Sequence, residues 1–180
     1  MNLSDIRFPR KLEADETAET IRRALMARTV KLWPGSDFDV ARITMDDPLK
    51  KVLRTAKLMG RIRCGFEAVS VRLASERKGI MNVRERRGVP YGDRVSRLLL
   101  FSNDGAERFY RHIEFLLQAH APRLLGCLLD IDGCALGNLL TGKDRQIKLV
   151  MAEHKDVVSE TLRTMVAGHD RLLFSMIPKG

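Results

Sequence analysis

Two strongly apolar segments in the second half of the chain constrain its fold more than any other feature of the sequence. Val95 to Phe101 and Leu124 to Leu129 each have the length of a strand, and their apolar residues follow one another instead of alternating with polar ones. Such a pattern is typical of strands that are buried on both faces. Between them, Phe109, Ile113 and Leu116 repeat at helical spacing. We therefore predict an α/β fold in which helices cover both sides of a sheet.

The same patterns place the other elements along the 180 residues, a length that suits one domain. We predict helices at residues 17–30, 46–59, 65–77, 106–119, 134–140 and 156–166. We predict further strands at residues 38–44, 61–64, 146–152 and 171–177. Residues 1–15 hold many charges and few apolar positions, so we expect a loosely attached arm. Residues 78–94 hold glycines, a proline and five Lys or Arg residues, which predicts a long, mobile, basic loop.

The positive charge of the chain is concentrated in its middle. The formal net charge is +9, and residues 50–97 hold 14 Lys and Arg residues against 4 Asp and Glu. The segments on either side are close to neutral, with 8 basic and 9 acidic residues before it and 10 of each after it. Arginine suits contact with phosphate groups, because its planar guanidinium donates two parallel hydrogen bonds. The sequence therefore favours a polyanionic partner over a merely solvated basic face.

The cysteines and the hydropathy pattern bear on the compartment. Cys64, Cys127 and Cys134 form no Cys-x-x-Cys pair, so we expect free thiols and no structural zinc. No apolar stretch approaches the roughly 18 residues that span a membrane, and the first residues show no apolar signal core. We therefore expect a cytoplasmic protein that does not associate with membranes.

Two motifs resemble enzyme signatures, and each departs from its signature at a residue that the chemistry needs. Asp130-Ile131-Asp132-Gly133 follows an apolar strand as in haloacid-dehalogenase-type phosphatases, but Cys134 replaces the usual threonine, and we expect these carboxylates to cap a helix. Gly137 to Lys143 has the glycine and lysine spacing of a P-loop, yet Asp144 stands where Ser or Thr would hold magnesium.

The remaining candidates for chemistry also lack a site pattern. The four histidines have no neighbours at metal-ligand spacing; they are His112, His120, His154 and His169. Phe66 and Phe109 lie at helical spacing, which predicts core positions. We therefore predict no metal, no cofactor and no catalytic residue.

Several short motifs follow one another in a distinctive order. Ala56-Lys57-Leu58-Met59-Gly60 ends a helix, Arg61-Ile62-Arg63 is a short strand, and Cys64-Gly65-Phe66-Glu67-Ala68-Val69 opens the next helix. Later come the apolar strand Leu98 to Phe101 with its polar end, Ser102-Asn103-Asp104, and the glycine-containing segment Leu136 to Arg145. In this order, from Leu49 to about Met165, the chain resembles the kink-turn RNA-binding family of ribosomal proteins, including its bacterial members.

The resemblance implies a three-layer α/β/α sandwich with a central mixed sheet for residues 49–180. Residues 1–48 would form an N-terminal extension, and residues 78–94 a basic insertion. In the family, the first strand-to-helix junction and the loop before the last strand hold a sharply bent RNA backbone. Gly65 and Glu67 match the motif at that junction, where a glycine lets the RNA approach a helix N-terminus.

We therefore predict a non-catalytic protein that binds structured RNA, ribosomal or other, and reads mainly its backbone and shape. The predicted contact residues are Lys57, Arg61, Arg63, Gly65, Glu67, Arg72, Lys78, Arg84, Arg86, Arg87, Lys143 and Arg145. Two alternatives stay open. One is a scaffold or protein-interaction module whose basic loop docks an acidic partner, and the other is an enzyme whose site has no recognisable signature.

Overall fold

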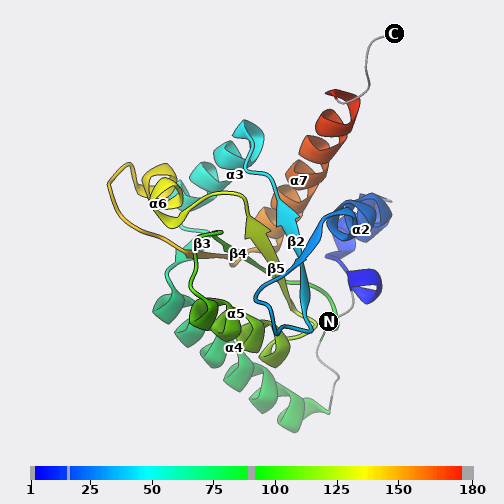
Figure 1. The fold of residues 1–180 in the computed structure, drawn as a ribbon. Coiled ribbons are helices and arrows are strands. Elements are labelled where there is room, and N and C mark those ends of the chain that lie inside the picture. The colour runs from blue at the N-terminus through cyan, green and yellow to red at the C-terminus, as the bar shows by residue number, and fades with distance from the viewer. Residues whose placement is uncertain (1–2, 16, 89–91, 176–180) are drawn as a thin grey trace.

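A computed structural model describes residues 3–15, 17–88 and 92–175. At its centre lies a mixed sheet with the strand order β1-β2-β5-β4-β6-β3 (Figure 1). β2, β5 and β4 are parallel to one another, whereas β1, β6 and β3 are antiparallel to their neighbours. The strands are β1 (Thr29–Lys31), β2 (Asp39–Ile43), β3 (Ile62–Cys64), β4 (Arg97–Phe101), β5 (Leu124–Leu129) and β6 (Leu149–Ala152).

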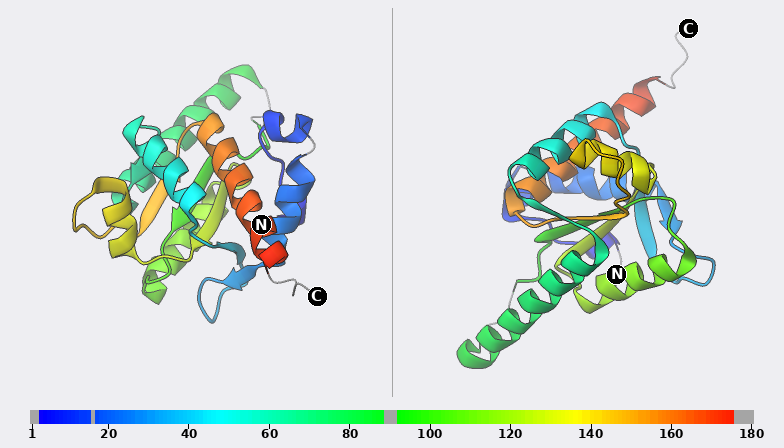
Figure 2. Two further views of the ribbon diagram at one scale, coloured as in Figure 1. Left: turned by 90° about the horizontal axis from the view of Figure 1, so that it is seen from above. Right: turned by 90° about the vertical axis from the view of Figure 1, so that its left-hand side faces the viewer.

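Helices cover both faces of this sheet, which confirms the predicted α/β fold (Figure 2). They are α1 (Arg10–Ala14), α2 (Thr17–Ala27), α3 (Asp47–Leu58), α4 (Phe66–Arg87), α5 (Glu107–Ala119), α6 (Gly133–Thr141) and α7 (Lys155–Ser175). On one face lie α2, α3, α6 and α7, and on the other α4 and α5. Among the described residues, none of the helices is both long and apolar enough to cross a membrane.

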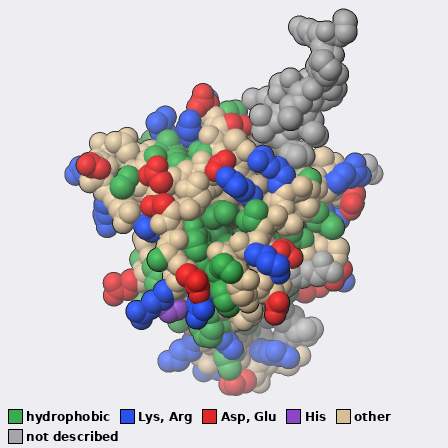
Figure 3. Space-filling model, in the orientation of Figure 1, with side chains coloured by type: hydrophobic (Ala, Val, Ile, Leu, Met, Phe, Trp, Pro, Cys, Tyr) green, Lys and Arg blue, Asp and Glu red, His purple; other side chains and the backbone are tan. Residues whose placement is uncertain are grey.

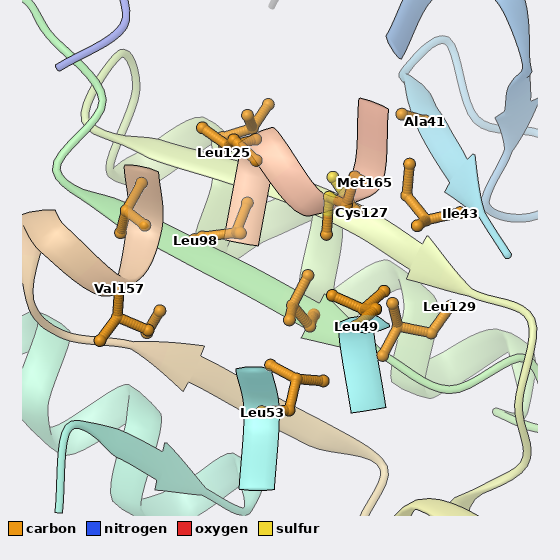
Figure 4. Close-up of a cluster of buried hydrophobic side chains, with 14 of the residues drawn as sticks. Ala41, Ile43, Leu49, Leu53, Leu98, Leu125, Cys127, Leu129, Val157 and Met165 are labelled. Atoms are coloured by element: carbon orange, nitrogen blue, oxygen red, sulfur yellow. The ribbon is translucent and has the colours of Figure 1, made fainter. Parts of the chain in front are cut away.

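The side chains of β4 alternate between two hydrophobic cores. Leu98 and Leu100 pack in the core that α3 and α7 cover, and Figure 4 shows Leu98 in one cluster with Leu53 and Val157. Leu99 and Phe101 pack on the opposite face, in the core that α4 and α5 cover. These four side chains of β4 are fully buried. A strand covered on both faces explains why its residues are apolar at consecutive positions.

Several predicted elements have the expected bounds for the expected reasons. β5 covers the predicted residues. α3 begins where predicted, because the carboxylate of Asp46 accepts a hydrogen bond of 3.0 Å from the N–H of Leu49 and Pro48 stands in the first turn.

The predicted loose arm at the N-terminus is instead packed against the body of the protein. Leu3, Ile6, Phe8 and Leu12 are buried in the core on the α2 and α7 side of the sheet. The N–H of Phe8 donates to Glu13, and its carbonyl accepts from Arg94. The four apolar residues are spread among charges, so no helical or strand period reveals them. Residues 29–43 of the predicted extension also supply β1 and β2 to the sheet.

The predicted basic loop is also wrong for most of its length, because α4 continues from Phe66 to Arg87. Glycine in a helix interior is about 1 kcal/mol less favourable than alanine. This cost does not end α4 at Gly79, because most of the residues around Gly79 are good helix formers. The helix ends at Gly88, whose N–H donates to the carbonyl of Arg84. Residues 89–91 of the predicted loop lie outside the described residues.

The predicted last strand, residues 171–177, is wrong as far as it is described. α7 extends from Lys155 to Ser175 and includes Arg171 to Phe174. Leucine and arginine are good helix formers, and the sequence holds no proline that would end the helix earlier. Residues 176 and 177 lie outside the described residues.

Candidate functional site

The turn between β3 and α4 has the geometry of an open helix N-terminus. Gly65 is the N-cap of α4 with a φ of 91° and a ψ of 146°, a conformation that strongly favours glycine. Its N–H donates a hydrogen bond of 2.8 Å to the carbonyl of Leu149. Nothing lies within 4 Å of the position that a β-carbon would occupy. The first N–H groups of a helix have no intrahelical partner, so this end of α4 offers donors to a ligand.

The loop between α6 and β6 lies beside this turn. Cys64 at the end of β3 pairs with Val150 in β6, so the residues that lead into β6 are next to Gly65. Gly137 in α6 keeps the loop close to that helix, because a β-carbon there would lie 1.5 Å from the carbonyl oxygen of Arg145. The side chains of Lys143 and Arg145 are exposed.

Two cations converge on the same place from different elements. Burial raises the pKa of the Cys64 thiol, whereas the nearby charges of Lys57 and Arg145, together with a hydrogen bond to Lys57, oppose that rise. Lys57 from α3 and Arg145 from the α6–β6 loop therefore both lie near Cys64. We call the surface formed by Lys57, Gly65, Glu67, Lys143 and Arg145 the junction surface; the side chain of Glu67 is exposed there in the first turn of α4.

Arg63 and Arg72 are engaged in ion pairs. Arg63 donates a hydrogen bond of 2.8 Å to Glu153. This hydrogen bond and the negative charge of Glu153 raise the pKa of the guanidinium. Arg72 lies 3.2 Å from Glu153 and 3.0 Å from Glu76. Both carboxylates are largely buried, whereas the side chains of Arg63 and Arg72 are 40% and 44% exposed, so each arginine reaches from the surface to a carboxylate partner.

The other predicted contact residues lie away from the junction surface. Arg61 precedes β3, whereas Gly65 follows it, so the two residues lie at opposite ends of that strand. The carbonyl of Arg61 accepts a hydrogen bond from the N–H of Glu153. Lys78, Arg84 and Arg86 are exposed on the second half of α4, and Arg87 is its last residue. We call residues 74–87 the distal arm of α4. The structure thus separates the predicted site into the junction surface, an ion-paired pair of arginines and the distal arm.

The acidic motif after β5 has a structural role in this fold. Asp132 is the N-cap of α6 and accepts hydrogen bonds of 2.9 and 2.8 Å from the N–H groups of Cys134 and Ala135. Asp130 accepts from Arg42 at 2.8 Å and from Asn103 at 3.2 Å. The bond from Arg42 is the main cause that lowers the pKa of Asp130.

The neighbouring candidates also belong to regular structure. Most of the segment from Gly137 to Lys143 lies in α6, so it is helical where a P-loop would be open. In the described part of the chain, no group of three or more His, Cys, Asp and Glu side chains could hold a metal ion.

Two features escaped the sequence analysis. Asp104 accepts hydrogen bonds from Ser102 and from the N–H of Gly133. Burial raises the pKa of its carboxyl group, but these hydrogen bonds and the charge of Lys148 together lower the pKa below its ordinary value. Phe66, predicted as a core residue, is 36% exposed and lines a groove between α4 and α5. Its helical spacing was real, but it points to a face that the sheet does not cover.

A function for this chain has to be inferred from its own geometry and from the resemblance of the motifs around Gly65. No protein-family model matches this chain, and no curated protein matches it in sequence.

Proposed function

We propose that this protein binds structured RNA without catalysing a reaction, and that the RNA backbone lies on the junction surface. The observation that carries the proposal is the open turn at Gly65, an uncovered helix N-terminus flanked by the cations of Lys57 and Arg145. The free thiols of Cys64, Cys127 and Cys134 fit a reducing compartment such as the cytoplasm, where RNA is abundant.

Phosphate groups match this surface chemically. The N-terminus of a helix combines unpaired N–H donors with the positive end of the helix dipole, and both favour an anion. At Gly65 no side chain stands between these donors and a ligand. The guanidinium of Arg145 and the ammonium groups of Lys57 and Lys143 add charge around them. None of these groups reads a base edge, so recognition would depend on the shape of the RNA backbone.

The resemblance to the kink-turn family supports the same surface. In that family the first strand-to-helix junction and the loop before the last strand hold the bent RNA together. Here the corresponding segments are the β3–α4 turn and the α6–β6 loop, and the hydrogen bond from Gly65 to Leu149 holds them side by side. A rigid RNA bend could contact both at once.

The arginines of the region would contribute unequally. Glu153 and Glu76 already engage Arg63 and Arg72, so we assign phosphate contact to Lys57, Lys143 and Arg145 instead. The distal arm would add nonspecific attraction, because its cations are exposed but far along α4 from the turn. This division distinguishes shape-specific contacts from general ones.

The test compares two double variants that each reverse two exposed charges. Lys143→Glu with Arg145→Glu changes the junction surface, and Arg84→Glu with Arg86→Glu is the matched control on the distal arm. Binding is measured by fluorescence anisotropy with a sharply bent RNA and with a plain duplex of equal length. We expect the junction variant to lose about 100-fold affinity for the bent RNA, as charge-assisted hydrogen bonds of about 1.5–3 kcal/mol would give.

The distal-arm variant should weaken both RNAs alike and reduce the dependence of affinity on salt by about 0.7 in log–log slope for each lost contact. The proposal is wrong if the junction variant binds the bent RNA as tightly as the unchanged protein does. Charge variants are preferable to substitution of Gly65, because a side chain at its φ of 91° would strain the turn itself.

A further inference from the structure

A groove of about 640 Å³ runs between α4 and α5, the two helices that cover this face of the sheet in the described part of the chain. Its apolar walls are formed by Phe66, Ala74 and Met81 from α4 and by Phe115, Leu116 and Ala119 from α5. At one end the ring of Phe66 lies 5.6 Å from that of His112 across the groove, measured between centroids. The other end opens along the distal arm.

The groove exposes side chains that water solvates poorly. Phe115 is 67% exposed and Met81 is 51% exposed, whereas Leu116 beneath them is 7% exposed. The hydroxyl oxygen of Ser70 is also on the groove wall, and it is buried without a hydrogen-bond partner among the described residues. Scattered single apolar residues are ordinary on a surface, but apolar side chains gathered in one groove with an unpaired hydroxyl mark an interaction site.

The distal arm lacks the packing that usually holds a helix. Val69 and Leu73 are the buried residues of α4; beyond them Glu76 and Ile80 are half-buried, and the other described residues of the arm are exposed. Figure 2 shows α4 extending past the edge of the sheet. The arm also contains Gly79, Asn82 and Val83, which have low helix propensity. A short helix without tertiary packing is marginal in water, so a partner that packs against this arm would stabilise it.

The charge of the arm selects among possible partners. Residues 74–87 contain five Lys or Arg residues and two glutamates. One of these glutamates, Glu76, is already engaged by Arg97 and Arg72. Arg77, Lys78 and the other glutamate, Glu85, line the groove itself, so the charged residues of its wall are two cations and one carboxylate. In Figure 3, the lower part of the molecule, where α4 and α5 lie, shows Lys and Arg side chains and hydrophobic side chains, with some Asp and Glu side chains among them.

Two other occupants fit less well. A second copy of this chain would place two basic arms against each other, which like-charge repulsion opposes. An RNA that contacts the arm through phosphates would leave Phe115 and Met81 in water, because aliphatic and aromatic edges do not bind phosphate. An acidic partner with an apolar face satisfies both halves of the surface.

We propose that this groove docks an amphipathic helix of a partner protein, with its apolar side chains between α4 and α5 and its acidic side chains against the distal arm. A helix rises about 1.5 Å per residue, so the α5 wall from His112 to His120 is about 12 Å long and accommodates about two turns. Apolar anchors at positions i, i+4 and i+7 of the partner would reach the groove. The groove begins beside the junction surface, because Phe66 lies between Gly65 and Glu67, but the proposed docking does not depend on RNA binding.

The test uses a designed peptide as the probe. It is a fluorescein-labelled helix of about 16 residues with leucines at i, i+4, i+7 and i+11 and glutamates on both flanks. A matched probe keeps the leucines and replaces every glutamate by lysine. We expect the acidic probe to bind the full chain at least roughly tenfold more tightly than the basic probe does, and this ratio to shrink as salt is added.

Substitutions in the groove identify the binding surface. Phe115→Glu and Met81→Glu should each weaken the acidic probe by about tenfold or more, because they place a charge among the apolar anchors. The matched control is Leu58→Glu, since Leu58 on α3 is 88% exposed and lies outside the groove. It should leave the affinity unchanged. All three positions are exposed, and circular dichroism checks that each variant is folded.

Three results would overturn the proposal. The first is equal binding of the acidic and basic probes, or unchanged binding by Phe115→Glu. The second is a dimer in sedimentation that Phe115→Glu dissociates, because the groove would then hold a second copy. The third is an equal loss of bent-RNA affinity in Phe115→Glu and in the junction variant, because the groove would then belong to the RNA site. Retained peptide binding by the junction variant supports the proposal.

Discussion

In the first half of α4, Val69 and Leu73 are buried against the sheet, whereas none of the described apolar side chains from Ala74 onward is buried. Both halves are helical without interruption. The first half is held by the core, and the second half is presented to solvent with its basic side chains and one wall of the groove. One helix thus combines a structural part with a part that is free to contact a partner.

This difference separates two kinds of information in the sequence. Helix formation depends on local propensity and on the absence of a terminating residue, so it extends past the edge of the core. Burial depends on what the rest of the chain places opposite each residue. The distal arm has the local propensity to be helical, but the rest of the chain places little opposite it. Its exposed surface is therefore available for binding.

The largest contrast between the halves should appear when one core side chain is shortened. Leu73→Ala removes a leucine that is 2% exposed and should lower the free energy of unfolding by about 3 kcal/mol. Met81→Ala in the distal arm should change it by no more than about 0.5 kcal/mol. Urea denaturation followed by circular dichroism measures both. Equal losses would mean that the arm is packed as firmly as the first half.

The regular part of the fold follows from local patterns in the sequence. β4 and β5 are apolar at consecutive positions because both faces are covered, and α3 carries its own N-cap at Asp46. The predictions that were wrong concern segments whose local sequence pattern is weak or ambiguous. Gly79 and many charges suggested a loop in α4, and Leu3, Ile6 and Phe8 showed no period although they are buried.

The candidate site was predictable in part. The motif around Gly65 pointed to the β3–α4 turn, and the charge count pointed to the middle of the chain. Which cations are engaged depends on tertiary contacts: Arg63 meets Glu153, which is distant in the sequence. The groove was not predictable, because Phe66 has the spacing of a core residue and only its surroundings show that it lines a groove.

A second contrast concerns the ion pairs at the boundary between the halves. Glu76 is largely buried and accepts hydrogen bonds of 2.8 and 3.1 Å from Arg97 at the start of β4. Glu76→Gln leaves that half-buried guanidinium without its carboxylate and should lower the free energy of unfolding by about 2 kcal/mol.

The matched control is Glu85→Gln, an exposed change farther along the same helix, which should have an effect of no more than about 0.5 kcal/mol. Thermal melting at matched ionic strength measures both variants. If Glu76→Gln is as stable as the unchanged protein, the ion pair between Glu76 and Arg97 does not help to hold α4 on the sheet.

A third and smaller effect tests whether the distal arm is helical in solution. Gly79 lies inside α4, and nothing is within 4 Å of the position of an added β-carbon. Gly79→Ala should therefore raise the free energy of unfolding by about 0.5–1 kcal/mol and increase the helical circular dichroism signal. Gly92→Ala, outside the helices and also without neighbours, is the control. No gain in either quantity would favour a loop at this position.

The smallest effect is a pH dependence at the end of α5, where the groove meets the distal arm. Burial lowers the pKa of His120 from its ordinary value of 6.5; the charges of Arg77 and Arg123 lower it further, and Glu76 opposes them. Near and below pH 6.5 the unfolded chain therefore binds a proton that the folded chain does not, so the free energy of unfolding falls as the pH decreases through this range and levels off below the folded pKa. His120→Gln should remove this part of the slope while leaving stability near pH 8 almost unchanged. Urea titrations at about pH 8, 6.5 and 5.5 measure it, and an identical slope in the variant would show that His120 is not shielded by the arm.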